Sequence, residues 1–390
     1  METVRLYDDD AYLTMCSAKV LSCTPIRNRW DTVLDRTCFY PEGGGQPCDL
    51  GTLDDARVSD VQIRDGIIHH AADRPLEPGS TVHGEIAWSR RFDLMQQHSG
   101  EHIVSGIVHR LFGYDNVGFH MGTDVITVDW NGILTREDLR TIESEANRVV
   151  WQDRETEIFT PVPSELETLE YRSKKALDWP VRIVRFPGAD TCACCGTHVR
   201  RAGEIGLIKL LSVVRMRGGV RVEMISGQRA LAYCTRIQEE NRRTSLLLSA
   251  KETETAAAVQ KLYDEHQALK ERRAGLEAAY CGAVAGQYQG QGDCLLFVGH
   301  TDTNSLRRLA VAVMETCGGC CAVFAPNQSG GYAWCIGQEG GDVRALVKEL
   351  NQALHGRGGG KPHFAQGAVQ AGAEEITEFF RARHFRTPQP

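Results

Sequence analysis

Two pairs of residues with metal-ligand chemistry share a spacing of four along this chain. His98 and His102 form the first pair, and Cys194 and His198 form the second. Positions i and i+4 lie on one face of a helix, so two imidazoles at this spacing can reach one ion. Three imidazoles and one thiolate suit zinc, and suit magnesium or calcium poorly. We therefore expect the four residues to bind one Zn²⁺ per chain.

The histidine pair alone is ambiguous, because a helix with one exposed and one buried histidine gives the same pattern. The cysteine–histidine pair favours a shared metal, since separated pairs at ligand spacing seldom coincide by accident. Apolar residues follow the histidines and predict a helix there; they are Ile103, Val104, Ile107 and Val108.

A glycine-rich segment at residues 37–47 is the second candidate for chemistry. Its three consecutive glycines, Gly43, Gly44 and Gly45, are typical of a flexible turn. Glycines also let a backbone approach a ligand closely and direct N–H groups at it. In that second interpretation the three glycines bind substrate, and Gln46 hydrogen-bonds the same ligand.

Composition limits the class of protein. The chain has 390 residues, of which 42% are hydrophobic and 24% charged, as expected for a globular protein of two or three domains. The sequence opens without an apolar signal core and has no run long enough to span a bilayer. We therefore expect a cytoplasmic protein without membrane contact, whose 14 cysteines are mostly reduced thiols. The net charge of -7 argues against non-specific coating of nucleic acid, but not against a local basic groove.

The elements that must position these residues follow from periodicity and turn signals. Residues 1–88 are predicted to form a small β-barrel, with short strands at 18–21, 31–34 and 61–63. Residues 89–233 are predicted to form an α+β domain, with one helix through His98 and His102 and another at 138–150. Strands are expected in this part at 117–121, 125–129, 181–184, 205–211 and 220–224.

Beyond residue 233 the sequence predicts a long solvated helix at 236–280, rich in charged residues, Ala and Leu and without proline. An apolar stripe along it is interrupted by His266 and Arg273. The helix therefore fits either a spacer or half of a dimeric coiled coil. The stripe consists of Val259, Leu262, Leu269 and Leu276.

The last part of the chain, after a linker at 286–292, predicts a small α/β domain. Strands are expected at 295–298, 321–324 and 332–336, and helices at 305–316 and 343–354. A glycine-rich loop predicted at 356–367 contains Arg357 and Lys361. Such a loop is either a plain turn or a place where a phosphate or an RNA backbone binds.

Four of these motifs occur together in a known family. They are residues 39–47, the helix with His98 and His102, residues 194–199, and residues 203–206 followed by 221–223. They resemble the editing domain of alanyl-tRNA synthetase and, more closely, the free-standing alanyl-tRNA editing proteins of the AlaX type. Residues 293–390 resemble the C-terminal domain of that synthetase and the DHH-associated domain. Nearly the whole chain is thus similar to the long form of the editing family.

The resemblance implies an activity and a partner. Because the sequence starts at the editing part, the implied activity is hydrolysis in trans of tRNA(Ala) wrongly charged with serine, or with glycine, without aminoacylation. The family's ligand set carries over to His98, His102, Cys194 and His198. The C-terminal domain is expected to contact tRNA outside the acceptor end, with Arg357 and Lys361 as substrate-binding candidates, or to mediate homodimers.

Three residues are catalytic candidates: Thr37, Gln46 and Glu101. Thr37 matches a threonine that the family uses near the substrate, and we expect it to recognise the serine hydroxyl; its other interpretation is a β-branched strand residue. Glu101 stands where the family more often has an uncharged residue. It is either an idle carboxylate on the helix surface, which we favour because nothing shows it facing the substrate, or an added proton acceptor.

A second departure from the family is Cys195, which stands where the synthetases usually have glycine. Cys194 and Cys195 are therefore both candidates for the thiolate ligand. Whether zinc acts chemically or only positions the tRNA end is also open, since four protein ligands make a closed site typical of structural zinc.

Two rival functions follow from the same residues. One is a tRNA-binding module with a purely structural zinc. The other is a metallopeptidase, because residues 98–102 fit H-x-x-E-H with Glu101 as the base. The peptidase pattern gives no role to Cys194, to His198 or to the glycine-rich segment.

The predicted fold class is α+β. Residues 1–88 form the β-barrel, and residues 89–233 form the zinc-binding editing domain, similar to the second additional domain of the synthetase. Residues 234–292 form the long helix and linker, and residues 293–390 form the C-terminal α/β domain, similar to the DHH-associated domain.

Overall fold

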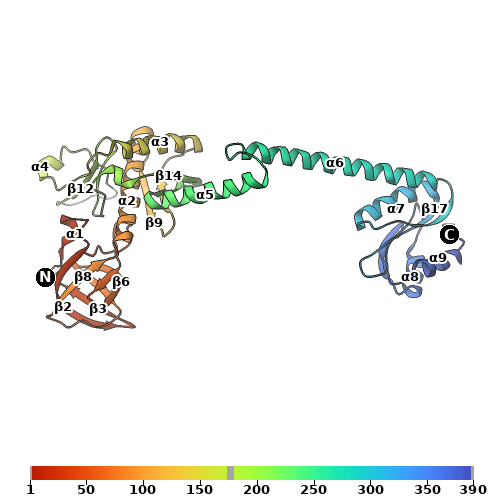
Figure 1. The fold of residues 1–390 in the computed structure, drawn as a ribbon, viewed down its shortest axis with the longest axis horizontal. Helices are drawn as coiled ribbons and strands as arrows, with labels where there is room; N and C mark the ends of the chain where they lie inside the picture. The colour runs from red at the N-terminus through yellow and green to blue at the C-terminus, as the bar shows by residue number, and fades with distance from the viewer. Residues whose placement is uncertain (1, 174–179, 388–390) are drawn as a thin grey trace. The chain divides into compact units, whose positions relative to one another are not determined.

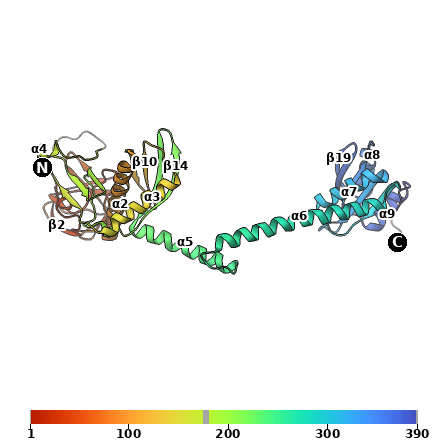
Figure 2. The same ribbon diagram turned by 90° about the horizontal axis from the view of Figure 1, so that it is seen from above.

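The computed structural model describes residues 2–173 and 180–387, and it shows a mixed α/β fold. The chain divides into two compact units, Met1–Arg243 and Thr244–Pro390. Figures 1 and 2 show the helices and strands of each unit in two views. Among the described residues, no helix is both long enough and apolar enough to cross a bilayer.

The first unit begins with a closed barrel of six strands, in the order β2-β3-β7-β6-β5-β8. Alternate residues of β2 and β8 are buried and exposed, which is the period-two pattern of strands with one face in a core. A short helix, α1 (Leu6–Asp9), and a parallel pair, β1 (Val4–Arg5) with β4 (Arg36–Thr37), flank the barrel. The barrel strands are β2 (Met15–Ile26), β3 (Arg29–Leu34), β5 (Gly51–Leu53), β6 (Ala56–Arg64), β7 (Ile67–Ala72) and β8 (Thr81–Ile86).

The second part of this unit is built around helix α2 (Trp88–Phe112), which leads from the barrel into two small sheets (Figure 1). A four-stranded sheet has the order β14-β15-β10-β9, and helix α3 (Arg136–Gln152) packs against β14 and α2. A three-stranded sheet has the order β11-β12-β13. The strands are β9 (Asn116–Met121), β10 (Ile126–Trp130), β11 (Glu157–Phe159), β12 (Ile183–Phe186), β13 (Asp190–Ala193), β14 (Ile208–Met216) and β15 (Gly219–Ser226), with short helices α4 (Pro163–Leu166) and η1 (Ala202–Ile205) between them.

Helix α2 is buried on all sides over residues 94–108, rather than amphipathic. Two glycines allow its neighbours to approach. A Cβ added to Gly100 would lie 2.1 Å from the Oγ of Ser226, and one added to Gly106 would lie 2.3 Å from the carbonyl oxygen of Ala189. Each glycine costs the helix about 1 kcal/mol of helical propensity relative to alanine, but it allows the neighbouring backbone and side chains to pack closely.

A buried ion pair joins α2 to the barrel. The Nε of Arg91 lies 3.0 Å from both carboxylate oxygens of Asp49, and its Nη atoms donate to the carbonyls of Ala11 (2.6 Å) and Cys38 (2.7 Å). Asp49 also accepts from the backbone N–H of Tyr40 at 2.7 Å. Both charged side chains are fully buried. This network holds the segment that carries the glycine-rich turn against the start of α2.

The second unit contains a five-stranded sheet with helices on both faces. Strand order is β16-β17-β18-β20-β19; β16 and β17 are parallel, joined through α7, and the other pairs are antiparallel. Helices α6 and α7 pack on one face and α8 and α9 on the other. The elements are α6 (Thr255–Gln287), β16 (Gly292–Phe297), α7 (Thr303–Cys317), β17 (Gly318–Pro326), β18 (Tyr332–Gln338), α8 (Arg344–Ala353), β19 (Arg357–Lys361), β20 (Phe364–Val369) and α9 (Ala373–Arg381).

Three local predictions are wrong in this half of the chain. The single helix expected at 236–280 is two helices, α5 (Gly227–Leu247) and α6, because Ser249 adopts a left-handed conformation (φ 51°) and ends the first. The linker expected to begin at 286 is shorter, since α6 continues to Gln287. The glycine-rich loop is a strand, β19, paired with β20 from Arg357 to Lys361.

The Arg91–Asp49 pair generates a prediction about stability. Arg91→Met should lower the free energy of unfolding by about 3 to 5 kcal/mol, because it leaves a buried carboxylate without its cation. The matched control is Arg221→Met, which removes an exposed pair with Asp129 and should change the free energy of unfolding far less than Arg91→Met does. Urea titration followed by tryptophan fluorescence measures both. Equal effects of the two substitutions would contradict the role given to Arg91.

Candidate metal centre

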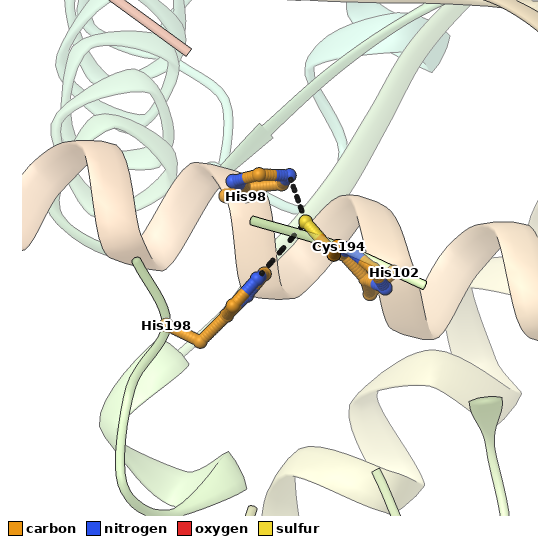
Figure 3. Close-up of side chains that lie close together, drawn as sticks. All are labelled: His98, His102, Cys194 and His198. Carbon is orange, nitrogen blue, oxygen red and sulfur yellow. Dashed lines mark hydrogen bonds between the residues drawn. The ribbon is translucent and has the colours of Figure 1, made fainter. Parts of the chain in front are cut away.

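The structure brings His98, His102, Cys194 and His198 together in the first unit (Figure 3). One ligand atom from each lies within 4.8 Å of the others. The Sγ of Cys194 is 3.5 Å from the Nε2 of His98 and 3.4 Å from the Nε2 of His198. Tetrahedral zinc with ordinary bond lengths would separate sulfur and nitrogen ligands by about 3.6 Å. The four side chains can therefore hold a metal ion with little rearrangement.

Two elements supply these ligands. Helix α2 places both histidines on one face, and the segment after β13 carries Cys194 and His198. Arg182 holds that segment, since its Nη1 donates to the carbonyls of Cys194 (2.8 Å) and Gly196 (3.1 Å). A Cβ added at Gly196 would lie 2.2 Å from the ring of His98. Glycine at position 196 thus lets the segment come down onto the helix.

Gln46 sets the orientation of the first histidine. Its Oε1 lies 2.9 Å from the Nδ1 of His98 and also accepts from the backbone N–H of Thr197 at 3.1 Å. Its Nε2 donates to the Oγ1 of Thr197 at 2.8 Å. An amide oxygen only accepts, so the Nδ1 of His98 carries the proton and its Nε2 is bare toward Cys194. Gln46, a predicted catalytic residue, is completely buried and contacts a ligand ring.

The other two rings have oxygen partners at the same nitrogen. The Nδ1 of His102 lies 2.9 Å from Asp190, which Arg172 holds by two hydrogen bonds of 2.7 and 2.8 Å. The Nδ1 of His198 lies 3.4 Å from the Oγ of Ser99. Metal-binding histidines in proteins usually donate their second N–H to such an oxygen. The donor set and the ring orientations therefore fit a metal.

The electrostatics agree with a thiolate at this place. Burial would raise the pKa of Cys194, but positive charge on His98 and His198 when these rings are protonated, together with hydrogen bonds from His102 and His198, holds that pKa well below its usual value. Burial would likewise raise the pKa of Asp190, yet hydrogen bonds from His102 and Arg172 keep it below the ordinary range. The geometry brings Cys194 to the histidines, whereas the neighbouring Cys195 is exposed and lies outside the cluster.

Glu101 is not the surface carboxylate that we favoured from the sequence. Only 4% of it is exposed, and it accepts hydrogen bonds from the Oγ of Ser105 (2.6 Å) and from the side-chain amide of Asn116. The prediction failed because α2 is buried on all sides, so a polar residue between two ligands need not face water. These contacts give Glu101 a structural role in the core.

Thr37 is buried in the barrel, and its hydroxyl has two partners. It lies 2.9 Å from the Nε2 of His70 and accepts from the N–H of Phe39 at 3.1 Å. The Nδ1 of His70 lies 3.2 Å from the carbonyl of Thr32, so that nitrogen carries the proton. Burial lowers the pKa of His70 to about 4, and the ring is neutral at pH 7. Thr37 therefore donates to His70 and keeps one acceptor lone pair.

The three glycines form a tight turn beside the cluster. Gly44 and Gly45 have positive φ angles of 61° and 85°, which other residues rarely adopt, and the backbones of Gly43 and Gln46 exchange hydrogen bonds. The turn leads directly into Gln46. A cavity of about 510 Å³ is lined by two of the glycines, Tyr40 and Cys195, together with Arg5, Asp8 and Arg182.

The other two predicted substrate-binding residues, Arg357 and Lys361, lie at the ends of β19 in the second unit. All five residues of β19 are exposed, and the strand forms one edge of its sheet. Sequence reasoning missed the partners Asp190, Ser99 and Arg172. Only Asp190 had a signal in the sequence: it lies four residues before Cys194, and a metal-bound histidine usually needs a hydrogen-bond acceptor such as a carboxylate.

Comparison with known proteins adds three matches to family models. Residues 16–90 match tRNA synthetases class II (A), residues 181–223 match the threonyl and alanyl tRNA synthetase second additional domain, and residues 293–383 match the DHHA1 domain. The fold and the cluster thus define a protein of the alanyl-tRNA synthetase-related class.

Individual relatives narrow this class. The chain is 33% identical to alanyl-tRNA editing protein Aarsd1-A of Xenopus laevis over 281 residues, 67% of this chain and 68% of that protein. It is 27% identical to alanyl-tRNA editing protein AlaX-L of Pyrococcus horikoshii over 95% of this chain and 96% of that protein. It is also 34% identical to the alanine–tRNA ligase of Ignicoccus hospitalis, but spans only 28% of that enzyme. The chain belongs to the family of alanyl-tRNA editing proteins.

The contact between Gln46 and His98 generates a prediction about metal affinity. Gln46→Leu should weaken zinc binding by about 10- to 100-fold, because His98 loses the acceptor that orients its ring. Competition with a chromophoric chelator measures the affinity. The matched control is Gln62→Leu, which removes an amide that bonds Glu42 and Asp60 in the barrel. Unchanged zinc affinity in Gln46→Leu would show that Gln46 does not position the His98 ring for metal binding.

Proposed function

We propose that this chain hydrolyses the ester bond of tRNA(Ala) charged with serine, with glycine as the second candidate amino acid. The observation that carries the proposal is the convergence of three imidazoles on Cys194, each ring held by an oxygen at Nδ1. Membership of the editing family supports the choice of tRNA(Ala) as partner.

We further propose zinc as the ion, held by His98, His102, Cys194 and His198, because a set of three nitrogens and one sulfur suits it. When bound there, zinc supplies Lewis-acid chemistry that polarises an ester carbonyl and acidifies water. Gln46 and Asp190 keep the rings in place, so little reorganisation is needed during the reaction.

The acceptor end of the tRNA is proposed to enter the cavity beside the glycine turn. Arg5 and Arg182 line this cavity and can pair with phosphate, and Gly43 and Gly44 leave their backbone accessible to the substrate. In the second unit, Arg357 and Lys361 at the exposed edge strand are proposed to contact the RNA backbone elsewhere.

Selection of serine over alanine is proposed to rest on Thr37. Its hydroxyl already donates to His70, so its remaining lone pair can only accept, and a serine side chain has an O–H to donate. An alanyl ester would leave that buried lone pair without a hydrogen-bond partner. A site that hydrogen-bonds a substrate hydroxyl therefore strongly rejects the analogue that lacks it.

A tRNA-binding module with a structural zinc is the second candidate, because four protein ligands fill a tetrahedral shell. The peptidase interpretation has less support, since the residues that join the two histidines are Cys194 and His198, and Glu101 is bonded to Ser105 and Asn116. Hydrolysis of the aminoacyl ester distinguishes the editing hydrolase from the tRNA-binding module.

The decisive test is deacylation of Ser-tRNA(Ala) by the purified, zinc-loaded protein. We expect loss of the serine ester, little loss from Ala-tRNA(Ala), and no activity after chelation. Cys194→Ala should reduce both bound zinc and deacylation to background, whereas Cys195→Ala should keep its zinc. Binding of tRNA with ester loss at the buffer rate, for both serine and glycine, would favour the binding module.

Substitution of Thr37 tests the proposed selection. Thr37→Val should lower kcat/KM for Ser-tRNA(Ala) by about 10- to 100-fold, the cost of one buried hydrogen bond, while the slow reaction of Ala-tRNA(Ala) stays unchanged. Thr37→Ser keeps the hydroxyl and should retain most of the activity. An equal loss of kcat/KM for both substrates in Thr37→Val would show that Thr37 stabilises the barrel core and does not select serine.

A further inference from the structure

A second cavity adjoins the one beside the glycine turn. It measures about 470 Å³, and His198 of the metal cluster contributes to its wall, so we call it the His198 cavity. Asp8 and Arg182 line both cavities, which means that the two cavities meet at these side chains. Because Arg182 also donates to the carbonyl of Cys194 at 2.8 Å, this junction lies close to the cluster.

Two carboxylates of the His198 cavity already have cationic partners. Asp10 lies 2.8 Å from Arg200, and Glu155 lies 3.3 Å from Arg201. Each of these charges is balanced within the protein. Neither carboxylate is therefore the first choice for a cationic ligand.

The other two carboxylates of this cavity, Asp8 and Asp9, make no side-chain hydrogen bond or ion pair with any residue in the described ranges. Burial raises the pKa of Asp8, and the positive charges of Arg182 and Arg5 offset this only in part. Asp8 has thus lost some of its hydration without gaining a hydrogen bond. A ligand that donates charged N–H groups to it would stabilise such a carboxylate.

A hydroxyl group in the same cavity also lacks a partner. Thr156 lines the His198 cavity, and its Oγ1 is buried without a hydrogen bond to any residue that the structure describes. The backbone of Thr156 is fixed, because its N–H donates to the carbonyl of Arg200 at 2.8 Å. A buried hydroxyl without a partner costs free energy, which a ligand with an N–H group would recover.

An aminoacyl ester carries a group that fits both acceptors. Its α-ammonium group is attached to the carbon next to the ester carbonyl, and it has one positive charge and three N–H donors. With the ester beside the metal cluster, this group lies next to the wall of the His198 cavity. A phosphate group of the RNA suits this place poorly, because Asp8 would repel it.

We propose that the His198 cavity binds the α-ammonium group of the aminoacyl ester, with Asp8 as the charged acceptor and Thr156 as the neutral one. The inference rests on the proposed hydrolysis of aminoacyl-tRNA and adds a requirement to it, a free α-amino group. Esters whose amino group is acylated, as in a peptidyl-tRNA, lack the charge and are rejected.

Deacylation of two esters of tRNA(Ala) by the zinc-loaded protein tests the proposal. One is Ser-tRNA(Ala), and the other is glyceroyl-tRNA(Ala), in which a hydroxyl replaces the α-ammonium group. Asp8→Asn should lower kcat/KM for the seryl ester by about 10- to 100-fold, the cost of a charge-assisted hydrogen bond, and leave that for the glyceroyl ester unchanged. Thr156→Val should lower kcat/KM for the seryl ester by about 3- to 10-fold, since its hydrogen bond is neutral.

Two further variants serve as controls. Asp55→Asn makes the same charge change at an exposed turn of the barrel, outside both cavities, and should leave both reactions unchanged. Asp9→Asn shows which of the two neighbouring carboxylates acts, and we expect it to change neither reaction by more than about 2-fold. The zinc content and circular dichroism of each variant show whether the cluster and the fold are intact.

The failure of this proposal and the failure of the proposed function give different results. A wild type that leaves both seryl and glycyl esters at the buffer rate overturns the function, and the ammonium site with it. An active wild type in which Asp8→Asn slows both esters equally, or neither, overturns the ammonium site alone. A selective loss in Asp9→Asn instead of Asp8→Asn would overturn the assignment to Asp8.

Discussion

Three buried imidazole rings and one half-buried thiol meet in the first unit, and such burial is tolerated only where the polar atoms have partners. The structure meets this constraint one ring at a time, with an amide at His98, a carboxylate at His102 and a hydroxyl at His198. Those acceptors come from three different places in the chain. The cluster can therefore form only when the barrel, α2 and the segment around β13 are all folded.

The barrel and the cluster are linked through a single segment. Arg91 fixes this segment at Cys38 and Asp49, and Gln46 lies between those two points with its amide on His98. His98 itself is seven residues, about two helical turns, after Arg91 on the same helix. The segment from Cys38 to Asp49 is thus fixed to α2 at two positions, Arg91 and His98. These two contacts explain how the side chain of Gln46, which follows a glycine turn, is held in a defined place.

Much of this arrangement could be predicted from the sequence, and the exceptions have physical causes. The four clustered residues could be found because His98 and His102 have the spacing of one helix face and the loop residues Cys194 and His198 repeat it. The barrel could be predicted because turn signals separate its short strands. Asp190 and Ser99 were missed because a hydrogen-bond partner needs no particular spacing. The burial of Glu101 could not be predicted because α2 is buried on every side, so its sequence has no alternation of apolar and polar faces. The sequence predicts a loop where the structure has β19, because three glycines obscure the strand propensity of their neighbours.

The open edge of β19 has a consequence for solubility. All five of its residues are exposed, although the Gly358 carbonyl accepts from the side-chain amide of Asn351 at 3.1 Å. An exposed edge can template the strands of another molecule and begin a fibre. Its three glycines offer no side chains that could pack against those of an added strand. Arg357 and Lys361 place a positive charge at each end, so two such edges repel one another. The composition of this strand thus protects the protein from aggregating along this edge.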